Sequence, residues 1–241
     1  MKILHITLLF LSMIQLSHGA AVVIDSMTRS ITTQANGSAP AISTQTTSGS
    51  FTATEQTNGS DQSLALASQN SILSNDSTFT FSKSGDFSAA GQRFGNTFAP
   101  VTLASESLVD VTFTLPTDAA FWISGSYAIT ATSGGAPEVA WSLTPVTTSG
   151  SAGFSGTAAS GSADFNTVGD LEPGQYNLQF KASLGNGAQY FGSNSNASAE
   201  FTELNFVVSP NAVVAPIPEP TSLSLLGLAS AIFMHRRRQR A

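Results

Sequence analysis

The chain has 241 residues, only 10% of them charged, and a formal net charge of −6 at pH 7. It contains no cysteine, which excludes disulfides, and its three histidines (His5, His18 and His235) all lie near the chain ends. In the part of the chain between His18 and His235, a zinc site of the usual kind is therefore excluded, and so are Ser-His-Asp and Cys-His catalytic systems. No Gly-rich phosphate-binding loop of the required spacing is present either.

Residues 1–20 have the pattern of a secretory signal peptide. Lys2 precedes an apolar stretch over residues 3–16, and small residues follow it, so that cleavage after Gly19 or Ala21 fits the usual rule. A retained membrane anchor is the alternative, but the apolar stretch is short and polar residues interrupt it. We therefore expect the Sec translocon to export the chain and signal peptidase to cleave it.

The exported body, residues 20–217, is strongly acidic. It has four basic residues against fourteen acidic ones, a net charge of −10, because most of the arginines lie in the C-terminal tail. Such a surface argues against binding to nucleic acid or to anionic membranes. It is compatible with divalent cations and with neutral polysaccharide.

Apolar and polar residues alternate along the second half of the body, and no stretch has a helical period. The alternation predicts five strands that end at Pro or Gly, over residues 109–115, 121–131, 139–143, 176–184 and 204–208. We expect an all-β fold, a single antiparallel β-sandwich of jelly-roll or Ig-like type, over residues 22–209. Trp141 is in phase with apolar neighbours, which places it in the core.

The pattern is weaker over residues 22–82, and two interpretations remain. This segment forms either the first strands of the same sandwich or a flexible arm rich in Ser and Thr. We favour the sandwich because apolar residues recur about every ten positions. In addition, a second half of five strands would leave one sheet face bare.

Residues 171–176 read Leu-Glu-Pro-Gly-Gln-Tyr and predict a turn that leads into a strand. Pro173 and Gly174 fit the central positions of a type II turn. The segment resembles the corner before the penultimate strand of many bacterial sandwiches, which implies that Tyr176 closes onto the preceding turn.

Trp122 is the strongest candidate for a binding residue. Its position has the opposite parity to Phe121 and Ile123, so it points away from the core if those two residues point inward. An exposed indole can stack on sugar rings, and Tyr190 and Phe191 could assist from a loop rich in Gly and Asn. The alternative is that Trp122 packs under a loop.

Acidic residues are candidates for two further kinds of site. Asp164, Asn166 and Asp170 are expected close together in a turn, where their oxygens are of the kind that Ca²⁺ accepts as ligands. A glycosidase would need two carboxylates, and the sequence singles out no pair among its five candidates. These candidates are Asp118, Glu138, Asp164, Asp170 and Glu172. We therefore expect no enzymatic activity, no cofactor and no other metal.

The C-terminal tail follows a short stalk, residues 210–217. It consists of Pro218-Glu219-Pro220, an apolar run over residues 223–234, and the basic residues Arg236, Arg237, Arg238 and Arg240. A spanning helix needs about 20 apolar residues, so this run predicts only a short transmembrane helix. The arginines favour a membrane position because they remain on the cytoplasmic side. A buried C-terminal helix of a globular domain is the alternative.

These three parts, over residues 218–241, resemble the PEP-CTERM sorting signal of Gram-negative bacteria. The resemblance implies an exosortase substrate, cut near Pro218-Glu219-Pro220 by a membrane-embedded, cysteine transpeptidase-like enzyme. It also implies association with exopolysaccharide and with biofilm or floc formation.

The resulting hypothesis is an exported, non-enzymatic surface or extracellular-matrix protein. The tail anchors it transiently at the inner membrane before it reaches the cell surface or the medium. A carbohydrate-binding module that uses Trp122 is the alternative, and a carboxylate glycosidase is the third hypothesis.

Overall fold

The computed structural model describes residues 21–59, 62–75, 81–94, 101–132, 135–146, 154–185, 188–189 and 195–210. These residues form thirteen strands and no helix, and they belong to one compact unit, Ala20–Asn211. Within these ranges, accordingly, no helix is long and apolar enough to cross a membrane. The predicted signal peptide and the predicted C-terminal anchor lie outside the described residues.

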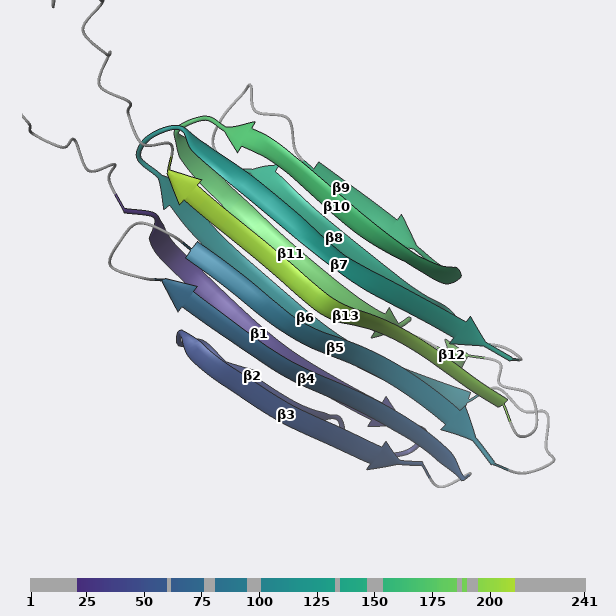
Figure 1. Cartoon of the computed structure of the whole chain (residues 1–241). Helices are drawn as coiled ribbons and strands as arrows, with labels where there is room; N and C mark the ends of the chain where they lie inside the picture. Colours follow the sequence, from purple (N-terminus) through teal and green to yellow (C-terminus); the bar gives the residue numbers. More distant parts are fainter. Residues whose placement is uncertain are drawn as a thin grey trace, which may run out of the picture. The chain divides into compact units, whose positions relative to one another are not determined.

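The strands form two antiparallel sheets, drawn as two layers in Figure 1. In the seven-stranded sheet the order is β2 (Ala41–Gln45), β1 (Val23–Ala35), β6 (Val101–Leu115), β11 (Gly174–Leu184), β8 (Pro137–Pro145) and β9 (Phe154–Ala158), and the short β12 (Ala188–Gln189) also pairs with β6. In the six-stranded sheet the order is β10 (Gly161–Leu171), β7 (Ala119–Ala131), β13 (Ser195–Pro210), β5 (Phe81–Arg93), β4 (Ser63–Asn75) and β3 (Gly49–Asn58). The expectation of an all-β, antiparallel fold is thus confirmed.

Eight of the strands pair in a nested way. β13 pairs with β5, β11 with β6, β10 with β7, and β9 with β8. The four N-terminal strands extend both sheets on one side, since β1 pairs with β6 and β4 pairs with β5. Most of the segment from residue 22 to residue 82 therefore lies in regular strands that continue the sheets.

The core lies between the two sheets, because every second residue of a strand points to the same face. In β6 the alternating residues Val109, Val111, Phe113 and Leu115 are all buried, as the sequence predicts. Aromatic rings from opposite sheets meet there: Phe180 of β11 and Phe201 of β13 have ring centroids 6.1 Å apart at an angle of 82°.

Near β1, β3 and β4 the interior is polar. Arg29 of β1 is fully buried, and its guanidinium donates hydrogen bonds to three backbone carbonyls. These belong to Thr47 at 2.6 Å, Gly49 at 2.8 Å and Ser71 at 3.3 Å. The guanidinium carbon also lies 5.6 Å from the centre of the Phe51 ring. Burial lowers the pKa of Arg29 because desolvation penalises its charged form.

The segment before β11 confirms one expectation and corrects another. The Tyr176 hydroxyl donates a hydrogen bond to the Glu172 carbonyl at 2.8 Å, which closes the predicted corner. The type II turn, however, is wrong. Gly174 has a φ of 157°, far from the value of about 80° that this turn requires at its third residue, and β11 already begins there.

Candidate functional site

Trp122 lies on the outer face of the six-stranded sheet. Its neighbours in β7, Phe121 and Ile123, point into the core, and the alternation of the strand turns Trp122 outward with 39% of its surface exposed. The register places Val168 of β10 directly opposite Trp122 on one side and Val207 of β13 on the other. We call this row of Val168, Trp122 and Val207 the apolar strip.

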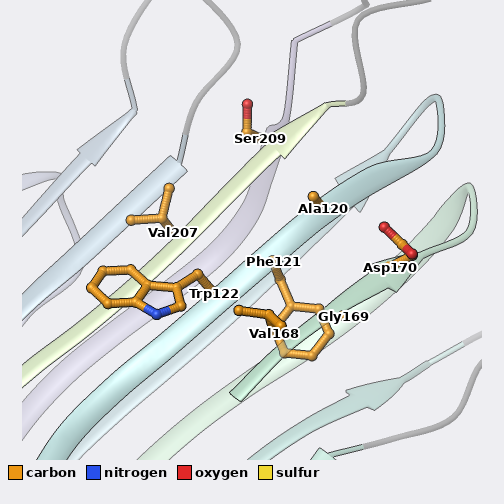
Figure 2. Close-up of a pocket in the computed structure, with 8 residues that line it drawn as sticks. All are labelled: Ala120, Phe121, Trp122, Val168, Gly169, Asp170, Val207 and Ser209. Carbon is orange, nitrogen blue, oxygen red and sulfur yellow. The ribbon is translucent and has the colours of Figure 1, made fainter. Parts of the chain in front are cut away.

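The apolar strip forms part of a hollow of about 380 Å³ on this face. Figure 2 shows Val207 and Val168 on either side of the indole, with Ala120 and Ser209 farther along the same strands. The small side chains of Ala120 and Ser209 leave space beside the indole. The residues that line the hollow are Ala120, Phe121, Trp122, Val168, Gly169, Asp170, Val207 and Ser209.

A hydrogen bond holds the indole in place. Trp122 Nε1 donates to Asn166 Oδ1 at 2.8 Å, and Asn166 lies two residues before Val168 on the outer face of β10. The site therefore presents an aromatic ring whose orientation is set before any ligand arrives.

The residues considered for calcium are not in a turn. Asp164, Asn166 and Asp170 all lie on β10, at alternating positions of its exposed face. At roughly 3.3 Å of rise per residue, six residues of a strand separate Asp164 from Asp170 by about 20 Å, too far for one ion. Asp164 accepts a hydrogen bond from Ser126 at 2.7 Å instead. The described ranges contain no group of three or more His, Cys, Asp or Glu residues that could hold a metal ion.

The carboxylates considered for a glycosidase are dispersed. Glu138 lies on the outer face of the seven-stranded sheet, whereas Asp164 and Asp170 lie on the outer face of the other sheet. Asp118 and Glu172 are exposed in the connections next to the paired residues Ala119 and Leu171. The sequence singles out no pair among the five. The pairing of β10 with β7 places only Asp118, Asp170 and Glu172 near the same end of these two strands.

The two tryptophans lie in different surroundings. Trp141 of β8 is partly buried against the core and stacks on Phe165, with centroids 5.2 Å apart and planes 5° apart. Tyr190 and Phe191 lie outside the described residues, as do Pro218-Glu219-Pro220 and the arginines of the tail.

Val168 and Val207 are the apolar neighbours of Trp122 that sequence reasoning missed. Each is an apolar residue at an outward position of its strand, which is a visible but common signal. Only the pairing of β7 with β10 and β13 places both beside Trp122.

A comparison with protein-family models found none that matches this chain, and no curated protein matches it either. The fold and the site thus define the protein as an all-β protein of two antiparallel sheets, with an exposed aromatic hollow on one sheet face.

Proposed function

We propose that this protein is an exported, non-enzymatic surface or extracellular-matrix protein that is sorted through its C-terminal tail. The observation that carries the proposal is the order of parts in the tail: Pro218-Glu219-Pro220, a short apolar run and a basic cluster. The resemblance of this tail to PEP-CTERM signals supports processing by an exosortase-like enzyme.

The proposal includes a jelly-roll body. The nested pairing of β5 with β13, β6 with β11, β7 with β10 and β8 with β9 supports this assignment, because a jelly roll wraps eight antiparallel strands in two sheets. In this proposal β1 to β4 are additions that widen both sheets.

The two ends of the chain act in sequence. The signal peptide directs the body through the Sec translocon, and the tail then holds it at the inner membrane. The apolar run is shorter than the roughly 20 residues that a stable span requires, which suits a transient anchor. Cleavage near the Pro-Glu-Pro motif releases the body to the cell surface or the medium, where exopolysaccharide surrounds it.

Mass spectrometry of the C-terminal peptide of the protein from its native cells tests the processing step. We expect the mature protein to lack the arginine cluster. We expect the Glu219→Ala variant to keep the arginine cluster and to remain in the membrane fraction. Pro216→Ala, just outside the motif, is the matched control and should be processed normally. An intact arginine tail on the mature wild-type protein would refute the proposal.

A further inference from the structure

We propose that the hollow around Trp122 binds a neutral polysaccharide chain, with the indole stacked on the apolar face of a pyranose ring. This inference rests on the proposed delivery of the protein to a polysaccharide-rich surface, and it names the partner. It assigns the binding to the apolar strip together with Asn166, Asp170 and Ser209.

The shape of the apolar strip fits an extended chain. Val168, Trp122 and Val207 lie in register across three neighbouring strands, and strands are about 4.8 Å apart, so the strip is roughly 10 Å long. It lies on an open sheet face rather than in a closed cavity, so a polymer can pass over it in both directions. Val168 is 72% exposed, and this area becomes buried when a sugar chain covers the strip.

The orientation of the indole is set in advance. The hydrogen bond from Trp122 Nε1 to Asn166 Oδ1 restricts the rotation of the ring. A ring that is already ordered loses less conformational entropy on binding, which favours the complex. Stacking between an aromatic face and the C–H groups of a sugar therefore needs no rearrangement of this side chain.

Polar groups that suit sugar hydroxyls lie beside the strip. The Asn166 amide uses its oxygen for Trp122, while its amino group still offers N–H donors. Asp170 lines the hollow and can accept hydrogen bonds, and Ser209, also in the lining, can donate or accept. A few directed polar groups around an apolar surface are the usual composition of a ligand site.

The charge of the site favours a neutral partner over an anionic one. Asp170 is part of the lining, and Asp164 lies on the same face of β10. The whole body carries a net charge of −10, so an anionic polymer would be repelled at the site and at long range.

Intrinsic fluorescence measures this binding directly, because the chain has only two tryptophans. The exported protein, purified from the producing cells as Trp141→Phe, reports Trp122 alone. Titration with cellohexaose and chitohexaose, two neutral oligosaccharides, should change its emission in a saturable way. An anionic oligouronide of equal length should produce no such change.

Retention on insoluble cellulose and chitin then separates the variants. Trp122→Ala should weaken binding about tenfold or more, because stacking of one aromatic ring contributes roughly this factor. Asn166→Ala frees the indole and should weaken binding by a smaller factor. Ile72→Ala is the matched control, since Ile72 is an exposed apolar residue on β4 of the same sheet, and it should bind like the wild type.

Several results would overturn the inference. These are binding that survives Trp122→Ala, no binding of folded wild-type protein to either glycan, and binding of the oligouronide alone. Self-association that Trp122→Ala abolishes, without glycan binding, would instead identify a contact between copies. Trp122→Phe retains an aromatic ring in case the alanine variant fails to fold, and it should keep part of the affinity. All these results are independent of whether the arginine tail is removed.

Discussion

Arg29 shows how a single residue can organise the interior of a sheet protein. Its buried guanidinium is directed at backbone carbonyls rather than at a carboxylate. One of these carbonyls, that of Thr47, belongs to the connection between β2 and β3, and another is that of Gly49, the first residue of β3. That connection passes from one sheet to the other. Arg29 therefore ties β1 to the segment that links the sheets, at the cost of desolvating its charge.

Replacing Arg29 with methionine tests this role. Arg29→Met keeps much of the side-chain volume but leaves three carbonyls without their donor, so we expect the free energy of unfolding to fall by about 2 kcal/mol. Urea denaturation measures the change. Lys181→Met, on the outer face of β11, is the control and should stay within about 0.5 kcal/mol of the wild type. A variant at least as stable as the wild type would mean that desolvation of the guanidinium outweighs its hydrogen bonds.

The two tryptophans also differ for reasons at the residue scale. Both sit on strands with regular alternation, and the parity of their neighbours predicts which one faces the core. That parity correctly places Trp122 outward, and it places Trp141 against the core. It does not predict the partners of either ring, Asn166 and Phe165, because both come from β10.

At the scale of elements, the sequence predicts less than half of β13, because it indicates a strand only over residues 204–208 whereas β13 spans Ser195–Pro210. Its register shifts at Thr202 and Glu203, and Glu203 has a φ of 54°. The backbone N–H of Glu203 donates to Asp86 Oδ1 at 2.9 Å, which stabilises this bulge. Because a bulge reverses the alternation, Phe201 and Leu204 are both buried although their positions have opposite parity.

The sequence does not predict β10 as a strand, and the reason differs from that for β13. Its outer face carries Asp164, Asn166 and Asp170, and these residue types favour turns in isolation. The pairing of all eleven residues with β7 overrides this local preference. Pairing with a distant segment supplies hydrogen bonds that the local sequence does not encode.

Close contact between β4 and β5 leads to a prediction about Gly85. A Cβ atom at this position would lie 2.2 Å from the Asn70 carbonyl oxygen, and the φ of Gly85 is 148°. We expect Gly85→Ala to lower the free energy of unfolding by roughly 3 kcal/mol, from steric overlap and backbone strain together. Thermal unfolding followed by circular dichroism measures the change.

Gly161→Ala separates the two contributions. Gly161 also has a positive φ, 81°, but a Cβ there would meet nothing within 4 Å. Gly161→Ala should therefore lower the free energy of unfolding only by the cost of backbone strain, about 1–2 kcal/mol. Equal losses in both variants would show that the contact with Asn70 relaxes without cost.

At the scale of the whole molecule, β1 to β4 and the later strands form one compact unit, Ala20–Asn211. Both tryptophans lie on β7 and β8, far along the sheets from β1 to β4. We expect urea to unfold the body in one transition, with tryptophan fluorescence and far-ultraviolet circular dichroism giving the same midpoint. Loss of dichroism before any change in fluorescence would instead mean that the N-terminal strands unfold independently.

The amino-acid sequence by itself determined the type of structure, the inward faces of several strands and the exclusion of cysteine and histidine chemistry from the body. These properties depend on local alternation and on residue inventory, so they can be read without knowing which strands pair. Only the tertiary structure decided that Val168 and Val207 flank Trp122, that β10 is a strand, and that Arg29 joins the connection between the sheets. The physical reason is that register and bulges arise from hydrogen bonding between strands far apart in the chain.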